Sequence, residues 1–524
     1  MPGAPGARNL HISEERRPGR AATNGAGAEP RIVIIGAGFS GLGMAIRLKR
    51  AGIEDFVVLE RATDVGGTWR ANTYPGCQCD VPSHLYSFSF ALNPNWSRTY
   101  APQPEIWEYL REVTDRFGIR ERIRFDTEVQ ESIWDEGERR WIIETSRGTI
   151  AAPILIAGPG PLTEPSYPDI PGLERFQGTV FHSADWNHEH DLEGERVAVI
   201  GTGASAIQLV PHVQRHASKL HVFQRTPPWV LPHSDRPITG FERSLYRRIP
   251  YLQRMVRRGI YWIRESVVPG LTRNQVLLKP LQLAARRHLR RQVRDPKLRE
   301  RLTPDYTIGC KRILPSNTWY PAITKANVEV VTDGIAEIRE RSIVTADGTE
   351  REIDTLICAT GFHVTDIPAA EGIRGRDGRT LAEIWDGSPQ AYLGTTIAGF
   401  PNLFMLLGPN TGLGHTSVVI MVEAQIAYVM GCLRTMAERG TETVEVKASA
   451  QERYNERLQA RLADGVWSAG GCQSWYIDRN GRNATIWPEF TWRFRQRTAR
   501  FDPESYEIRQ AEPAEVEERE AAPV

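Results

Sequence analysis

The chain has 524 residues, of which 40% are hydrophobic and 25% are charged, and its formal net charge is +1 at pH 7. This length allows two or three domains of ordinary globular composition. The balanced charge gives no case for a nucleic-acid-binding protein, and no uninterrupted apolar run reaches the ~18 residues of a membrane span, so we expect neither nucleic acid nor stable membrane insertion.

Both ends of the chain are expected to be disordered tails. Residues 1–29 consist mainly of Gly, Ala, Pro and charged residues, without the hydrophobic core of a signal peptide. Residues 509–524 form an acidic tail rich in Glu, Ala and Pro. The N-terminal composition favours a cytoplasmic location.

A glycine loop follows the first predicted strand. The run Arg31–Ile35 leads into a G-x-G-x-x-G sequence, whose glycines are Gly36, Gly38 and Gly41. Glu60 lies 24 residues after the first of these glycines, where the second strand of a strand–turn–helix dinucleotide site ends beside the adenosine ribose. A carboxylate accepts hydrogen bonds from the ribose hydroxyls but repels a 2′-phosphate. The loop therefore predicts an unphosphorylated dinucleotide, and FAD is the expected ligand.

A second loop repeats this arrangement with the opposite charge. The run Arg196–Ile200 leads into Gly201, Gly203 and Ser205, and Arg225 lies 24 residues after the first glycine. A guanidinium pairs with phosphate through its planar fork, so this loop predicts a 2′-phosphorylated dinucleotide, NADPH. The alternative, that both loops are tight turns without ligands, leaves the two strand-end charges in register unexplained.

These loops predict an α/β protein with two Rossmann-like dinucleotide-binding domains. The FAD-binding domain is expected to be discontinuous, comprising residues 30–163 and 366–508, because the chain leaves it, builds the second domain and returns. The NADP-binding domain comprises residues 175–234 and 307–362. A proline-stiffened connector at 164–172 marks the boundary between them.

Residues 235–306 are rich in Arg and Leu and poor in β-branched runs, which predicts a helical insertion in the second domain. Its basic face bears Tyr261 and Trp262 and is compatible with contact with a membrane surface. We favour the other interpretation, a solvated helical subdomain that covers the active site.

A later apolar strand leads through Gly408 and Asn410 towards another helix. Because backbone donors at a helix N-terminus favour anionic oxygens, we expect this turn near the flavin and Asn410 among the cofactor contacts.

The six cysteines include no Cys-x-x-Cys pair, which disfavours a redox-active dithiol. Cys77 and Cys79 have no second ligand pair nearby for zinc, and we expect no metal site. Free thiols are expected throughout and agree with a reducing cytoplasm.

Two longer motifs carry a resemblance to a known family. Residues 176–186 follow F-x-G-x-x-x-H-x-x-x-W, with Asn187 where the family has Pro or Asp, and residues 66–80 match (A/G)-G-x-W-x-x-x-x-(F/Y)-P-(G/M)-x-x-x-D in full. From about residue 30 to about residue 500 the chain resembles type I Baeyer–Villiger monooxygenases, the class B flavoprotein monooxygenases. The resemblance implies oxidation of a small-molecule ketone to an ester or lactone with NADPH and O₂, through a flavin C4a-peroxide and a tetrahedral adduct.

The resemblance also implies roles for individual residues. Arg312 matches an arginine whose permanent charge stabilises the peroxide anion and the adduct, and Asp80 matches the acid that orients this arginine. Lys311, Arg225 and Thr226 match contacts of the coenzyme 2′-phosphate.

The other candidates that the resemblance implies lie at the flavin, at the substrate and between the domains. They are Gly67, Thr68 and Trp69 for the flavin, Trp475 near the nicotinamide and substrate, and His182 and Trp186 for an interdomain hinge. For Trp475, a simple packing role is nearly as well supported.

Two other functions are compatible with this pattern. One is oxygenation of amines or sulfides through the protonated hydroperoxide, on the same scaffold. The other is a flavin-binding NADPH sensor without turnover, which would have no use for a cation beside the flavin.

Overall fold

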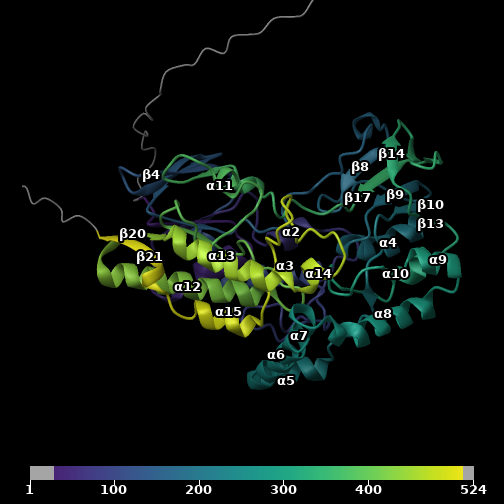
Figure 1. Cartoon of the computed structure of the whole chain (residues 1–524). Helices are drawn as coiled ribbons and strands as arrows, with labels where there is room; N and C mark the ends of the chain where they lie inside the picture. Colours follow the sequence, from purple (N-terminus) through teal and green to yellow (C-terminus); the bar gives the residue numbers. More distant parts are fainter. Residues whose placement is uncertain (1–28, 511–524) are drawn as a thin grey trace, which may run out of the picture.

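The computed structural model describes residues 29–510, which form two lobes with helices α5 and α6 below them in Figure 1. The predicted tails at 1–28 and 511–524 lie outside the described residues. The predicted tail boundaries are corrected at both ends. Strand β21 (Tyr506–Gln510) pairs with β20 (Thr441–Val446), so residues 509 and 510 are in regular structure. At the other end, Glu29 forms an ion pair with Arg140.

The first lobe is built on a parallel sheet with the strand order β19-β7-β1-β2-β3. Its central strand β1 is the β-branched run before the first glycine loop, and such runs suit a strand that is buried on both faces. Because β19 comes late in the sequence, the chain returns to this sheet after building the second lobe. The strands are β1 (Ile32–Ile35), β2 (Phe56–Leu59), β3 (Ile123–Arg124), β7 (Ile154–Ala157) and β19 (Leu403–Met405).

The second lobe repeats this design around the second glycine loop. Its parallel sheet has the order β13-β10-β9-β17-β8, with β9 in the central position that β1 occupies in the first sheet. The strands are β8 (Thr179–His182), β9 (Arg196–Ile200), β10 (Lys219–Phe223), β13 (Val328–Val331) and β17 (Thr355–Cys358). Each sheet thus places its glycine loop at the carboxyl end of a central strand, where open α/β sheets bind ligands.

A helix follows each glycine loop directly, α1 (Phe39–Arg50) in the first lobe and α4 (Ala204–His216) in the second. Helix α12 (Val418–Arg439) packs against α1 and against α15 (Thr491–Thr498). By length and composition α12 is apolar enough to cross a membrane, but 67% of its apolar window is buried inside the protein. It is therefore a core helix of the first lobe.

Smaller elements complete both lobes. A four-stranded sheet in the order β18-β4-β5-β6 packs on the first lobe, and a three-stranded sheet β14-β15-β16 packs on the second. These strands are β4 (Val129–Asp135), β5 (Arg140–Thr145), β6 (Gly148–Ala152), β18 (Ile373–Arg374), β14 (Ile335–Ile338), β15 (Ser342–Thr345) and β16 (Glu350–Glu352), and the pair β11 (Val230–Leu231) and β12 (Leu314–Pro315) is separate. The additional helices are α2 (Thr68–Ala71), α3 (Gln103–Arg116), α10 (Trp319–Ile323), α11 (Leu381–Trp385), α13 (Ala448–Ala463) and α14 (Val466–Ala469), with 3-10 turns η1 (Arg120–Arg122), η2 (Leu173–Arg175), η4 (Pro368–Ala370) and η5 (Pro503–Ser505).

The segment at 235–306 contains helices and no strand, as its composition predicts. Thr239 and Glu242 form a capping box at the start of α5, and Asp295 caps α9 before a proline at its first position. The elements are α5 (Gly240–Arg248), α6 (Pro250–Glu265), α7 (Val268–Thr272), η3 (Gln275–Leu278), α8 (Lys279–Gln292) and α9 (Pro296–Arg301).

Candidate active site

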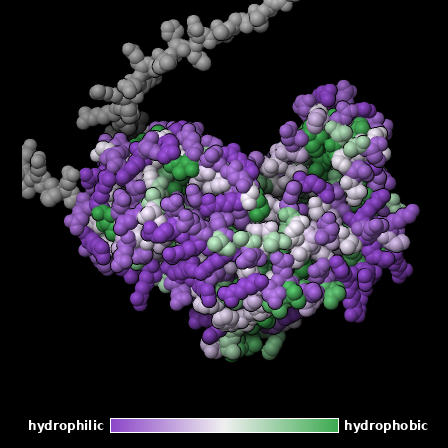
Figure 2. All heavy atoms as spheres, in the orientation of Figure 1, coloured by the Kyte–Doolittle hydropathy of each residue, from purple (hydrophilic) through white to green (hydrophobic). Residues whose placement is uncertain are grey.

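A cavity of about 1730 Å³ lies between the two lobes, and Figure 2 shows the cleft that separates them at the surface. Both glycine loops open into this cavity, so two dinucleotides bound there would meet. Most of the residues expected at the site line it, namely Gly36, Gly38, Glu60, Gly67, Thr68, Trp69, Asp80, Gly201, Gly203, Ser205, Arg225, Thr226, Lys311, Arg312 and Trp475. The other four, Gly41, Asn410, His182 and Trp186, are absent from its lining.

The first glycine loop has backbone geometry that requires its glycines. Gly36 has φ +90°, and a Cβ at this position would lie 2.6 Å from the carbonyl oxygen of Gly158. A Cβ at Gly41 would collide with the carbonyl oxygen of Gly36. Gly41 therefore allows α1 to approach the strand closely, which is a packing role. Gly38 is the N-cap of α1 and leaves the helix N-terminus open towards the cavity.

Glu60 lies at the end of β2, next to the first glycine loop. Its carboxylate accepts hydrogen bonds from the backbone N–H of Ala37 at 2.7 Å and of Ala62 at 2.9 Å, and the residue is only 7% exposed. A carboxylate has about four acceptor positions, so it keeps two for ribose hydroxyls. This buried carboxylate and the glycine cradle fit an unphosphorylated dinucleotide such as FAD.

The second glycine loop has the same backbone course. Gly201 has φ +115°, and a Cβ there would collide with the carbonyl oxygen of Ala359, just as Gly36 faces Gly158. Gly203 is the N-cap of α4, and a Cβ at this position would meet no atom within 4 Å. This cradle is open enough for the pyrophosphate of a second dinucleotide.

Two cations, Arg225 and Lys311, lie beside the second loop. Arg225 is exposed, and neither Arg225 nor Lys311 forms an ion pair with any residue between 29 and 510. Burial lowers the pKa of Lys311, and the nearby Arg225 charge lowers it further. An anion between the two would relieve this repulsion. The pair fits a 2′-phosphate, and the site fits NADPH.

Arg312 and Asp80 form a bidentate ion pair at the cavity wall. Arg312 donates from Nε to one Asp80 oxygen at 2.5 Å and from Nη2 to the other at 2.6 Å. Its third nitrogen, Nη1, donates to the carbonyl oxygen of Leu413 at 3.0 Å. These three contacts leave the guanidinium little freedom, since the planar fork is held on two sides.

The electrostatics of this pair keep both groups charged. Burial by itself raises the pKa of Asp80 and lowers the pKa of Arg312, because each charged form loses water. Their mutual attraction and hydrogen bonds outweigh burial in both cases. The pKa of Asp80 therefore lies below its ordinary value and the pKa of Arg312 lies above it. The cavity wall thus carries a permanently charged guanidinium, paired with a charged carboxylate, at any working pH.

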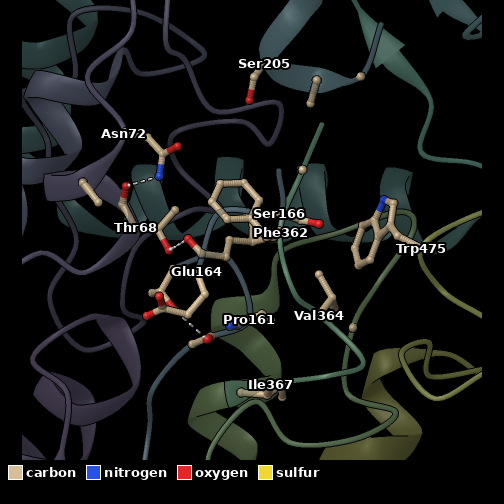
Figure 3. A pocket seen from close by; sticks show the side chains of 18 of the residues that line it. Thr68, Asn72, Pro161, Glu164, Ser166, Ser205, Phe362, Val364, Ile367 and Trp475 are labelled. Carbon is tan, nitrogen blue, oxygen red and sulfur yellow. Dashed lines mark hydrogen bonds between the residues drawn. The ribbon is translucent and has the colours of Figure 1, made fainter. Parts of the chain in front are cut away.

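The turn at 66–69 lies opposite the first glycine loop. Gly66 and Gly67 have φ +131° and +52°, conformations that residues with side chains rarely adopt, and a Cβ at Gly38 would lie 3.6 Å from the Cα of Gly67. Trp69 donates from Nε1 to the hydroxyl of Tyr86 at 3.1 Å, which fixes its ring. Figure 3 shows Thr68 on this side of the pocket, with Trp475 on the opposite side and Phe362 between them.

His182 lies where the two segments that join the lobes run side by side. The N–H of Ser166 donates to the carbonyl of Gly361 at 2.9 Å, so the outgoing and returning segments pair. The His182 ring packs against Tyr167 of one segment and Phe362 of the other, with ring centroids 5.4 and 5.9 Å away. Burial lowers the pKa of His182 to about 4, so its ring is neutral near pH 7.

Trp186 and Asn410 also lie outside the cavity wall. Trp186 packs edge-on against Phe181, with ring centroids 5.0 Å apart. Asn410 is buried and donates from Nδ2 to the carbonyl oxygens of Asn483 at 2.8 Å and Ile486 at 3.1 Å. It therefore braces the turn after β19 through backbone contacts. The turn itself borders the cavity through Gly408, Pro409 and Thr411, but the Asn410 side chain is directed away from it into these contacts.

One cysteine expectation is wrong. Cys310 and Cys472 form a disulfide across 162 residues, while Cys77, Cys79, Cys358 and Cys432 are free. No spacing motif indicates this pair, because the return of the chain through α13 and α14 brings the two together. The bond joins the segment before Lys311 to the segment before Trp475.

A bridge between the lobes also escaped prediction. Gln208 on α4 donates from Nε2 to the carbonyl of Gln78 at 2.9 Å and accepts from the hydroxyl of Tyr74 at 2.9 Å. All three residues line the cavity. Neutral polar residues at these positions carry no sequence signal that distinguishes them from an ordinary helix surface.

Comparison with known proteins agrees with this architecture. Residues 33–240 match the family described as pyridine nucleotide-disulphide oxidoreductase. A Baeyer–Villiger monooxygenase of Streptomyces coelicolor is 52% identical over 93% of this chain and 94% of its own, and one of Pseudomonas aeruginosa is 51% identical over 91% of both. A closed crystal structure of cyclohexanone monooxygenase covers 92% of this chain and 99% of its own with a TM-score of 0.82 at 27% identity. The structure of a steroid monooxygenase bound to NADP covers 92% of this chain and 99% of its own with a TM-score of 0.80 at 31% identity.

The fold and the shared cavity define a flavoprotein oxidoreductase that uses FAD and NADPH. At this identity over more than nine-tenths of both chains, the protein belongs to the Baeyer–Villiger monooxygenases. It is an NADPH-dependent, FAD-containing monooxygenase that converts a ketone to an ester or lactone. The resemblance carried by the two sequence motifs is confirmed.

Proposed function

We propose that Arg312 is the catalytic cation of this ketone oxidation and that Asp80 is its positioning residue. The observation that supports this proposal is the bidentate pair at 2.5 and 2.6 Å on the wall of a cavity reached by both glycine loops. Once reduced by NADPH, bound FAD supplies the activation of O₂ from which one oxygen atom is transferred to the ketone. Arg312 stabilises the negative charge that develops on oxygen at the reacting carbonyl.

Arg312 suits this task because it cannot act as an acid. A guanidinium stays protonated, and the attraction of Asp80 raises its pKa further, so it stabilises an anion without protonating it. This property favours attack on an electrophilic carbonyl over transfer of oxygen to an amine or a sulfide. It also separates the protein from a sensor without turnover, in which a half-buried, paired cation at the cavity wall would have no use.

The surrounding residues have supporting roles in this proposal. Glu60 with Gly36 and Gly38 holds FAD, helped by Gly67, Thr68 and Trp69. Gly201, Gly203 and Ser205 hold the NADPH pyrophosphate, while Arg225, Lys311 and Thr226 bind its 2′-phosphate.

Trp475 is proposed to border the substrate, because its ring lines the cavity and is 47% exposed. His182 and Trp186 belong to a hinge between domains at 30–163 with 366–508 and at 175–234 with 307–362. The packing of His182 on both joining segments supports this role.

A cytoplasmic location is also part of the proposal. The requirement for NADPH supports it, whereas the disulfide removes the support that six free thiols would have given. The substrate remains a small-molecule ketone, with O₂ as the co-substrate.

The experiment is a comparison of Arg312→Ala with Arg453→Ala, an exposed arginine on α13 outside the cavity. Arg312→Ala is expected to leave flavin reduction by NADPH largely intact and to lower ester formation by at least ~100-fold, since removing one transition-state donor costs 10²–10³ in rate. Arg312→Lys should recover only part of the activity, because it keeps the charge and loses the fork.

Flavin absorbance in an anaerobic mixture measures the reduction, and mass spectrometry measures the added oxygen. A ketone and a sulfide are supplied side by side. Ester formation by Arg312→Ala at the rate of Arg453→Ala would refute the role of Arg312, and sulfoxide without ester from the wild type would favour the amine- or sulfide-oxygenating alternative.

A further inference from the structure

Exposed apolar side chains are concentrated on one part of the molecule. Of the thirteen large apolar side chains that the described residues expose, ten lie between residues 241 and 283. Figure 2 shows hydrophobic atoms gathered at the lower end of the molecule, where Figure 1 places α5 and α6. Large exposed patches of this kind mark surfaces that bind something.

Helix α6 presents its apolar side to the solvent. Tyr251, Met255 and Trp262 follow one another at helical spacing and are 65%, 53% and 49% exposed. Ile263, beside Trp262, is 70% exposed. In an ordinary surface helix these side chains would face the core.

The inward side of α6 combines the partly buried Leu252, Ile260 and Tyr261 with three polar residues. Gln253 is buried and donates from Nε2 to the carbonyl of Asn93 at 2.6 Å. Arg257 donates to the carbonyl of His84 at 2.7 Å. Glu265 is 1% exposed and accepts from the N–H of Thr491 at 3.1 Å. These bonds fix the orientation of α6, so the helix cannot turn to bury its apolar stripe without breaking them.

Exposed arginines lie on the same two helices as the apolar stripe. Arg247 and Arg248 on α5 and Arg254 and Arg258 on α6 are all exposed, and none forms an ion pair within residues 29–510. The acidic residues of these two helices do not offset them, because Glu242 is paired with Arg236 and Glu265 is buried. The face is therefore apolar at its centre and positive at its edge.

An apolar surface with exposed arginines favours some binding partners over others. Two copies of the chain meeting through this face would bring the two arginine sets together, which costs energy. A bilayer with anionic headgroups accepts both features, since the apolar side chains enter the acyl boundary and the arginines meet phosphate. We propose that the face formed by α5, α6 and η3 binds the surface of an anionic phospholipid bilayer, with α6 lying in the interface and no helix crossing it.

The face formed by α5, α6 and η3 is packed close to the segment that carries Lys311 and Arg312. Leu271 of α7 and Leu278 of η3 pack in one core cluster with Ile308 and Cys310, directly before the segment that carries Lys311 and Arg312. Next to Leu278, Val276 and Leu277 are each 58% exposed on the outer side. A docked enzyme would thus hold its cavity close to apolar ketones dissolved in the bilayer.

The test is co-sedimentation of the full-length, FAD-loaded enzyme with sucrose-filled vesicles. Wild type is expected to sediment with vesicles of phosphatidylglycerol and phosphatidylcholine, to bind vesicles of phosphatidylcholine alone much more weakly, and to be released by high salt. No sedimentation with the anionic vesicles would overturn the proposal.

Two variants and one control locate the contact. Trp262→Ser with Ile263→Ser removes the apolar contact, and Arg254→Glu with Arg258→Glu reverses the charge at its edge. Each is expected to weaken vesicle binding about tenfold or more. The control, Arg453→Glu with Arg457→Glu, reverses two exposed arginines on α13 and should leave binding unchanged.

All of these side chains are exposed, so flavin content and turnover of a water-soluble ketone should match the wild type. Equal binding by variants and control would refute the location. A vesicle-free dimer that Trp262→Ser with Ile263→Ser converts to a monomer would assign the face to self-association instead.

Discussion

Around Gly36 and around Gly201 the backbone follows the same course, yet the two sites are enclosed to different degrees. In the first lobe the turn at Gly67 closes over the glycine loop, and Glu60 is buried and bonded to the loop backbone. In the second lobe a Cβ at Gly203 would meet no atom of the described residues within 4 Å, and the corresponding charge, Arg225, is exposed and forms no ion pair among residues 29–510. On the proposed assignment, FAD would lie in the more enclosed first site and NADPH in the more open second site. The same strand, glycine loop and helix arrangement thus occurs at an enclosed site and at an open site.

The largest effects are expected from adding a methyl group at Gly36 and at Gly201, which tests whether the two loops bind different dinucleotides. Gly36→Ala and Gly201→Ala each force a side chain onto a positive φ and against a carbonyl, which should cost at least about 2 kcal/mol of folding stability. Gly36→Ala is expected to yield protein without bound FAD. Gly201→Ala is expected to stay yellow and to bind NADPH at least about tenfold more weakly.

Flavin absorbance of the purified proteins and a titration with NADP⁺ measure these effects. Loss of FAD from Gly201→Ala with normal FAD content in Gly36→Ala would reverse the assignment of the two sites.

The charge beyond the second loop offers a smaller and sharper change. Arg225→Ala is expected to weaken NADPH binding by about 10- to 100-fold, because a charge-assisted contact contributes roughly 1.5–3 kcal/mol, and to spare NADH. Steady-state KM values for both coenzymes measure the effect. Arg215→Ala, an exposed arginine on α4 outside the cavity, is the matched control. Equal losses for NADPH and NADH would contradict the role of Arg225.

The mildest change probes the openness of the second cradle. Gly203→Ala should alter the free energy of unfolding by no more than about 0.5 kcal/mol, because a Cβ there meets no atom within 4 Å. Thermal unfolding without coenzyme measures this, with Gly41→Ala as the contrast, since its Cβ would collide with the carbonyl of Gly36. A large loss of stability in Gly203→Ala would show that the second loop is as tightly enclosed as the first.

Local patterns were sufficient to predict much of this fold. Each β-branched run before a glycine loop became the central strand of a parallel sheet, and the charges 24 residues later lie at the two cradles. The pairing of Asp80 with Arg312 followed from family motifs and not from spacing, because 232 residues separate the two.

Features that depend on tertiary packing could not be predicted in this way. The bond between Cys310 and Cys472 and the contact of Gln208 with Gln78 join segments more than a hundred residues apart. The outward apolar face of α6 is set by the inward bonds of Gln253 and Arg257, whose partners are backbone carbonyls. A carbonyl is present at every position, so sequence does not indicate which one a side chain will reach.

The bond between Cys310 and Cys472 closes a covalent ring of chain that passes through both lobes. Arg312 lies two residues inside that ring, and Trp475 lies three residues beyond it. Both residues are therefore close in sequence to the same disulfide. A displacement of the backbone at Cys472 would therefore be transmitted to the backbone at Cys310, two residues before Arg312. The disulfide thus ties together the two wall segments that carry Arg312 and Trp475 at one point of the cavity rim.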